Sequence, residues 1–192
     1  MTDTAQSDLR SICIFCAASP GNDPVYAEAA AEMGRLIAEA GLRLVYGGGS
    51  VGLMGIVARA ARAAGGEVIG VIPGFLRYAE IPEDEVTKMH FVNSMHERKQ
   101  LMFDLSDAFV ALPGGIGTLD ETIEIMTWAQ LGQHAKPVLL VDTKGYWSAL
   151  LELLNTVVRE GFAKPSLAEL YEVVPTPEAA IGTLLARPAQ GV

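Results

Sequence analysis

The stretch Phe109-Val-Ala-Leu-Pro-Gly-Gly-Ile-Gly-Thr-Leu-Asp-Glu121 decides which fold this sequence predicts. Its first residues form an apolar run that is typical of a buried strand, and the glycines after Pro113 predict a tight turn that opens a helix. The first N–H groups of a helix have no internal partner, and the positive end of the helix dipole lies beside them. Strand, glycine turn and helix together therefore predict a phosphate-binding loop.

Carboxylates follow this loop directly. Asp120 and Glu121 are not part of a phosphate seat, because carboxylates and phosphates repel each other, whereas the Thr118 hydroxyl can donate to a phosphate. One interpretation is that the two carboxylates only complement the helix dipole. The other is that one of them takes part in chemistry beside the phosphate. Glu124 lies one turn after both, so spacing alone does not decide which carboxylate faces a ligand.

A second glycine loop occurs earlier in the chain. Gly47-Gly-Gly-Ser-Val-Gly52 follows the apolar segment Leu42–Tyr46 and precedes a helical pattern that begins at Leu53. One such loop is weak evidence, since glycine turns after strands also serve only to reverse the chain. Two of them in one chain of 192 residues favour a nucleotide or sugar-phosphate site.

Strand and helix patterns alternate along the whole chain. The apolar runs Ser11–Phe15, Glu67–Ile72 and Pro137–Val141 predict buried parallel strands. The sequence therefore predicts an α/β fold with a doubly wound, mostly parallel sheet and helices on both faces. Ligands of such sheets bind beyond the carboxyl ends of the strands, where the strand order reverses. Both glycine loops follow strands and lie at that edge, and the small-residue turn from Ala17 to Asn22 could line the same ligand.

The length and charge of the chain limit its function further. Residues 1–192 fit a single domain, with ends at 1–10 and 187–192 that we expect to fray. A net charge of −9 argues against nucleic acid as a partner. The start of the chain lacks a signal pattern, and no apolar run approaches the ~20 residues of a membrane helix, so we expect no membrane partner and a cytoplasmic protein.

Two cysteines, Cys13 and Cys16, form a C-x-x-C at the end of the first strand. A redox motif would have this pair at the start of a helix, and a zinc site would need a second pair of ligands. The histidines, His90, His96 and His134, are too scattered to suggest metal ligands. We therefore expect no metal site.

A basic pair stands early in another predicted helix. Ser94 is expected to cap a helix over Met95–Phe103, with Glu97 at the capping-box position. Arg98 and Lys99 lie close to the N-terminus of this helix, where cations match the dipole poorly. A bound anion, or a carboxylate from the helix that follows the glycine turn near Gly117, would explain an arginine at this place.

Three motifs together resemble one known family. Pro113 to Glu121 (PGGIGTLDE), Gly47 to Gly55 (GGGSVGLMG) and the Arg98-Lys99 pair are similar to the LOG family, the cytokinin riboside 5′-monophosphate phosphoribohydrolases, often mislabelled as lysine decarboxylases. The likeness extends from Ile12 to Gly132. It implies a Rossmann-like homodimer that hydrolyses the N-glycosidic bond of an adenosine-type 5′-monophosphate and releases free base and ribose 5-phosphate, without a cofactor.

The resemblance also implies roles for particular residues. Arg98 and Glu121 correspond to the catalytic pair of the family, and Asp120 occupies a variable position of the motif. The remaining substrate-binding candidates lie in the two glycine loops and at three further positions: Gly47, Gly48, Gly49, Ser50, Glu80, Lys99, Gly114, Gly115, Ile116, Gly117, Thr118 and Asp120. The sequence leaves open whether Arg98 orients Glu121 or contacts the nucleotide.

The chemistry agrees with this resemblance. Cleavage of a ribosyl C–N bond passes through an oxocarbenium-like state, which a nearby carboxylate stabilises. The main alternative is a non-catalytic nucleotide-binding or carrier protein on the same fold. A lysine decarboxylase would need a lysine that forms a Schiff base with pyridoxal phosphate, and no lysine of this chain stands in such a context. Whether the base is adenine or an N6-modified adenine stays open.

Overall fold

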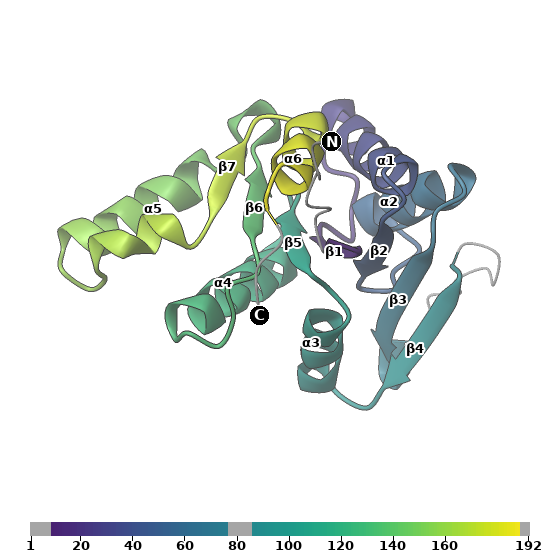
Figure 1. The fold of residues 1–192 in the computed structure, drawn as a ribbon, viewed down its shortest axis with the longest axis horizontal. Helices are drawn as coiled ribbons and strands as arrows, with labels where there is room; N and C mark the ends of the chain where they lie inside the picture. Colours follow the sequence, from purple (N-terminus) through teal and green to yellow (C-terminus); the bar gives the residue numbers. More distant parts are fainter. Residues whose placement is uncertain (1–8, 77–85, 189–192) are drawn as a thin grey trace, which may run out of the picture.

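A computed structural model of the protein describes residues 9–76 and 86–188 (Figure 1). Within these residues, seven parallel strands form one sheet in the order β4-β3-β2-β1-β5-β6-β7. The strands are β1 Ser11–Phe15, β2 Arg43–Tyr46, β3 Val68–Pro73, β4 Lys88–Val92, β5 Ala108–Ala111, β6 Val138–Val141 and β7 Glu172–Val174. The helices are α1 Pro24–Glu39, α2 Gly52–Ala63, α3 Met95–Asp104, α4 Ile116–Gln130, α5 Ser148–Arg159 and α6 Pro177–Leu185. The predicted doubly wound α/β fold is confirmed.

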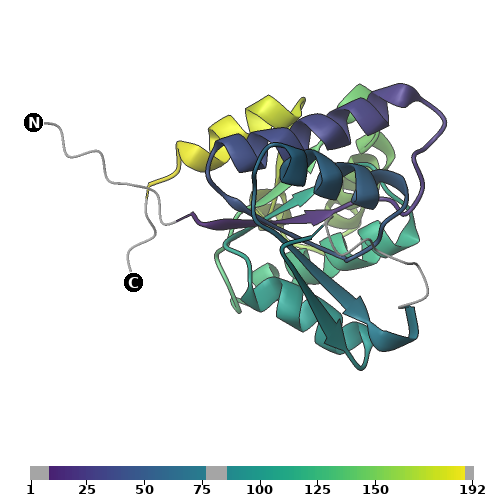
Figure 2. The ribbon, with the colours of Figure 1, turned by 90° about the vertical axis from the view of Figure 1, so that its right-hand side faces the viewer.

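Helices cover both faces of the sheet (Figure 2). Side chains of β1 alternate between the two layers, so that Ile12 and Ile14 pack with α1, α2 and α6, while Cys13 and Phe15 pack on the side of α3, α4 and α5. All residues of β1 are buried. Burial of each large aliphatic side chain contributes roughly 1.5–3 kcal/mol, so the central strand holds the two layers together.

The strand order reverses beside β1. The chain winds from β1 outward to β4 and then returns to place β5 against the other edge of β1. The loops that follow β1 and β5 therefore meet: the Leu112 N–H donates to the Phe15 carbonyl at 2.9 Å, and the Ala17 N–H donates to the Pro113 carbonyl at 3.3 Å. Ligands of doubly wound sheets bind at such a reversal.

Helix ends follow the capping residues predicted from the sequence. The Asp23 side chain accepts from the Val25 N–H at the start of α1, and the Ser94 hydroxyl accepts from the Glu97 N–H at 3.1 Å. The Glu97 carboxylate reaches back to the N–H of Asn93 at 2.7 Å. The first bond of the capping box is in its usual place, whereas the return bond goes to the N–H of the residue before the N-cap and not to that of Ser94 itself.

Two element boundaries differ from the sequence patterns. The sequence of Val86 to Val92 predicts a strand, which begins at Lys88 as β4. The apolar pattern of Tyr146 to Arg159 predicts a helix, which begins at Ser148 as α5, after the short 3₁₀ turn η3 (Thr143–Gly145). Both differences are two residues long, within the usual uncertainty of element ends.

Parts of the stretches expected to fray lie within the described residues. The Arg10 N–H donates to the Asp107 carboxylate at 2.9 Å, and Asp107 also accepts from the N–H and the hydroxyl of Ser11. Near the other end, Arg187 donates to Glu172 at 2.8 Å. These side chains connect Arg10 and Arg187 to the body of the fold.

We predict that the glycine loop from Gly47 to Gly52 tolerates no side chain at Gly52. Its φ is 60°, and a Cβ atom there would lie 2.2–2.5 Å from backbone atoms of Ala18 and Ser19. Gly52→Ala should lower the free energy of unfolding by more than about 1 kcal/mol. Gly182→Ala is the matched control, because Gly182 lies inside α6 with open space around it; it should raise stability by about 0.5–1 kcal/mol.

Urea unfolding followed by circular dichroism measures both variants. A Gly52→Ala protein as stable as the wild type would show that Gly52 does not pack against the backbone of Ala18 and Ser19 as closely as described.

Candidate active site

A cavity of about 360 Å³ opens where the strand order reverses, beyond the carboxyl ends of β1 and β5. Two larger cavities, of about 540 and 620 Å³, lie between α3 and α4 and near the end of α5, and neither is lined by a residue of either glycine loop. We therefore place the candidate site in the smaller cavity. Its lining comes from the loop after β1, the first turns of α2 and α4, and α3: Cys16, Ala17, Ala18, Ser19, Met54, Arg98, Gly115, Gly117, Thr118 and Glu121.

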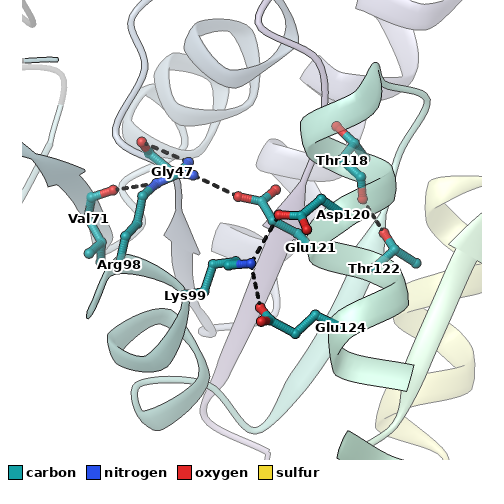
Figure 3. A network of polar contacts seen from close by, with 9 residues as sticks. All are labelled: Gly47, Val71, Arg98, Lys99, Thr118, Asp120, Glu121, Thr122 and Glu124. Atoms are coloured by element: carbon teal, nitrogen blue, oxygen red, sulfur yellow. Dashed lines mark hydrogen bonds and ion pairs between the residues drawn. The ribbon is translucent and has the colours of Figure 1, made fainter. Parts of the chain in front are cut away.

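A buried ion pair forms one wall of this cavity (Figure 3). Arg98 Nη1 donates to Glu121 Oε1 at 2.8 Å, with about a tenth of each side chain exposed. Arg98 also donates from Nε to the Val71 carbonyl at 3.1 Å and from Nη2 to the Gly47 carbonyl at 3.2 Å. One guanidinium thus connects β3, the first glycine loop and α4.

Burial determines the acidity of Glu121. Desolvation raises the pKa of the Glu121 carboxyl above its ordinary value of 4.5, and the positive charge of Arg98 opposes that rise. The neighbouring Asp120 carboxylate raises the Glu121 pKa further, while the Lys99 ammonium lowers it. Burial and three neighbouring charges therefore determine the acidity of this one carboxyl.

Lys99 belongs to a separate ion-pair cluster. Its Nζ lies 3.0 Å from Asp120 Oδ2 and 2.9 Å from Glu124 Oε2 (Figure 3). Lys99 and Glu124 line the neighbouring cavity between α3 and α4. Helical spacing alone did not decide which carboxylate faces a ligand. In the structure, Glu121 faces the candidate site, while Asp120 and Glu124 pair with Lys99.

Two helices start at the glycine loops without a side-chain cap. Val51 and Gly115 are the N-cap residues of α2 and α4, and neither helix has a hydrogen bond from a capping side chain. In contrast, Asp23, Ser94 and Thr176 cap α1, α3 and α6. The first N–H groups of α4 are therefore available to an anion.

Close packing explains why these loops are glycine-rich. A Cβ atom on Gly47 would lie 1.8 Å from Arg98 Nη2, and one on Gly114 would lie 2.1 Å from Thr118 Oγ1. The arginine and the threonine hence occupy space that side chains at Gly47 and Gly114 would otherwise fill.

The cavity brings together only part of the residues predicted for it. Arg98, Gly115, Gly117, Thr118 and Glu121 line it. Glu80 lies outside the described residues. The remaining candidates lie in the adjoining loops and helices, outside the lining: Gly47, Gly48, Gly49, Ser50, Lys99, Gly114, Ile116 and Asp120.

The lining also contains residues from outside the glycine loops. Ala17, Ala18 and Ser19 come from the small-residue turn that was expected to line a ligand. Neither Cys16 nor Met54 was predicted to line the site. Their signal is positional: Cys16 is the first residue after β1, and Met54 lies in the first turn of a helix that follows a glycine loop.

Two further properties concern the described residues as a whole. Within 9–76 and 86–188, histidine, cysteine, aspartate and glutamate side chains form no group of three that could hold a metal ion. The same part of the chain contains no helix with the length and apolar character needed to span a bilayer.

Comparison with known proteins gives close relatives. A family model described as possible lysine decarboxylase matches residues 54–184. A probable cytokinin riboside 5′-monophosphate phosphoribohydrolase of Oryza sativa subsp. japonica is 46% identical over 179 residues, which cover 93% of this chain and 73% of the relative. A cytokinin riboside 5′-monophosphate phosphoribohydrolase of Arabidopsis thaliana is 45% identical over 171 residues, covering 89% and 80% of the two chains.

Solved structures share the fold. The molybdenum cofactor carrier protein of Chlamydomonas reinhardtii superposes with a TM-score of 0.67 at 25% identity, covering 93% of this chain and 99% of the carrier. This similarity is more distant than that of the plant relatives. Given the family model and relatives that match along most of its length, the chain belongs to the LOG family of cytokinin riboside 5′-monophosphate phosphoribohydrolases.

Proposed function

We propose that this protein hydrolyses the N-glycosidic bond of cytokinin riboside 5′-monophosphates, or of AMP, to give free base and ribose 5-phosphate. One observation carries the proposal: the buried Arg98–Glu121 pair lines the same cavity as the uncapped N-terminus of α4. The reaction needs both a seat for the phosphate and a carboxylate near the sugar. The names of the relatives support the same reaction.

The phosphate seat lies at the start of α4. The N–H groups of Gly115, Gly117 and Thr118 lie at its uncapped end and can donate to phosphate oxygens, with the helix dipole favouring the negative charge. Binding at this remote group fixes the sugar relative to Glu121. Such positioning lowers the entropic part of the barrier for the bond that breaks.

Glu121 acts on the sugar. As the bond from C1′ to the base nitrogen breaks, its electron pair leaves with the base and positive charge develops on the ribose ring. The ionised Glu121 carboxylate stabilises this charge and orients the water whose oxygen adds to C1′. The water gives up a proton, and the departing base gains one, so the reaction is balanced without a redox partner.

Arg98 supports Glu121 in this mechanism. Its hydrogen bond to Oε1 favours the ionised carboxylate, while its other donors hold it to the Val71 and Gly47 carbonyls. A guanidinium fixed in three places keeps the carboxylate in one orientation.

The described residues give less support to the other functions considered. A carrier protein needs the phosphate seat but has no use for a buried carboxylate beside it. A lysine decarboxylase needs a lysine that reaches bound pyridoxal phosphate. The described lining of the cavity contains no lysine, and Lys99 is paired with Asp120 and Glu124.

We predict that the purified protein releases free base from AMP and from isopentenyladenosine monophosphate, detected by chromatography. The kcat/KM for adenosine should be at least about a hundredfold lower than that for AMP, because adenosine lacks the phosphate that positions the sugar. Binding of AMP without release of adenine would favour the carrier protein. Equal turnover of adenosine and AMP would contradict the phosphate seat.

We expect Glu121→Gln to lower kcat by about 10²–10³-fold and to change KM little, because Gln keeps the shape but not the negative charge. Asp120→Asn is the control, since Asp120 is exposed and pairs with Lys99; its kcat should stay within about tenfold of the wild type. Steady-state kinetics with AMP, on variants shown to be folded by circular dichroism, measure this. The assignment is wrong if Asp120→Asn abolishes turnover and Glu121→Gln spares it.

The pH dependence should follow the Glu121 pKa. Activity requires the ionised form and burial disfavours that form, so kcat/KM should fall on the acidic side with a midpoint above 4.5. Asp120→Asn removes a charge that raises the Glu121 pKa and should move this midpoint to lower pH. Lys99→Met removes a charge that lowers the Glu121 pKa and should move it to higher pH.

Profiles of kcat/KM between pH 4 and 8 test this pair of shifts. Midpoints that move in the same direction in both variants would show that another group controls the acidic side.

A further inference from the structure

Tyr146 contacts the phosphate loop from outside the cavity. It directly follows η3, the turn beyond the carboxyl end of β6, and β6 is the neighbour of β5 in the sheet. The Tyr146 hydroxyl donates a hydrogen bond to the carbonyl oxygen of Gly114. Gly114 immediately precedes Gly115, the N-cap residue of α4 and part of the cavity lining.

This hydrogen bond fixes the direction of the next N–H group. Gly114 C=O and Gly115 N–H belong to one planar peptide unit, and in a trans peptide the two groups point in opposite directions. The geometry points to Tyr146 as a positioning residue for the 5′-phosphate: by holding the Gly114 carbonyl on its own side, it directs the Gly115 N–H away from itself and toward the anion seat. This inference rests on the proposed function for the identity of the anion.

The loop has open space on one side. A Cβ atom built on Gly115 or Gly117 would meet no atom within 4 Å, so no side chain or backbone packs against these two positions in that direction. Successive glycines also have more backbone freedom than other residues, and that freedom has to be lost when the loop grips a phosphate. A hydrogen bond made before the ligand arrives reduces this cost.

Tyr146 is itself held in place. Its ring packs edge-on against Tyr26 and Trp147, with centroids 5.9 and 5.0 Å away. Trp147 is almost fully buried, and its backbone N–H donates to the Asp142 carboxylate at 2.7 Å. Tyr146→Phe keeps these ring contacts and removes only the hydroxyl, so the variant isolates the hydrogen bond to Gly114.

The test compares Tyr146→Phe with Tyr171→Phe. Tyr171 stands before β7, at the amino-terminal edge of the parallel sheet and away from the cavity, so its variant controls for loss of a tyrosine hydroxyl. Calorimetry gives the Kd of each protein for ribose 5-phosphate and for adenosine, which has no phosphate. Steady-state kinetics give kcat and KM for AMP.

For Tyr146→Phe we expect ribose 5-phosphate to bind about three- to tenfold more weakly, the range of one neutral hydrogen bond. The KM for AMP should rise by a similar factor, while kcat and adenosine affinity stay as in wild type. The melting temperature should fall by a few degrees at most, the cost of one hydrogen bond. Tyr171→Phe should change none of these quantities.

Two results would overturn the inference. One is wild-type affinity of Tyr146→Phe for ribose 5-phosphate. The other is an equal loss of ribose 5-phosphate and adenosine binding, which would mean that the hydroxyl supports the fold in general and not the phosphate seat. Release of adenine from AMP by the wild-type protein decides the proposed function separately, so failure of that function and failure of this inference are distinguishable.

Discussion

A buried guanidinium must find hydrogen-bond partners, and this constraint organises the side of the molecule on which the candidate site lies. Arg98 meets it with two backbone carbonyls and the Glu121 carboxylate, taken from β3, the first glycine loop and α4. The carbonyl of Gly47 comes close enough only because Gly47 has no side chain. The position of α3 against the sheet, the glycine at 47 and the rotation of α4 therefore depend on one side chain.

Such a pair is weak evidence for stability. Removing two charges from water costs about as much as their attraction returns, and apolar replacements of buried pairs are often neutral or stabilising. The Arg98–Glu121 pair lines a cavity, where an apolar pair would give no charge to a reacting sugar. Its value lies in holding an ionised carboxylate in place where burial alone would favour the neutral acid.

Local sequence signals predicted most of the fold. Gly41 ends α1 with a φ of 69°, Asp23 and Ser94 cap their helices, and the two glycine loops stand at the carboxyl ends of β2 and β5. These signals depend on a few neighbouring residues, so they can be recognised in the sequence alone. The starts of elements were less accurate, as at β4 and α5, because the ends of strands and helices carry weaker local signals than their interiors.

The site was predictable only in part. Adjacent residues on a helix point about 100° apart, so choosing between Asp120 and Glu121 requires the position of Arg98 in space. Tyr146 reaches Gly114 across 32 residues of sequence, a contact that no local pattern records. The family resemblance pointed to Arg98 and Glu121, which pair and line the cavity; their catalytic roles and the homodimer stay predictions.

The central place of β1 has a consequence for the order in which the molecule assembles. The Ser11 N–H donates to the Asp107 carboxylate, 96 residues further along the chain, and the pairing of β1 with β5 begins at the next residues, Ile12 and Ala108. Pairings between distant segments form late, because closing a long loop costs entropy before any contact repays it. During synthesis, β1 leaves the ribosome with one edge unpaired until β5 follows. The lining of the cavity includes Glu121 and the first residues of α4, so a chain interrupted before α4 would lack both this carboxylate and the helix start at which we propose that phosphate binds.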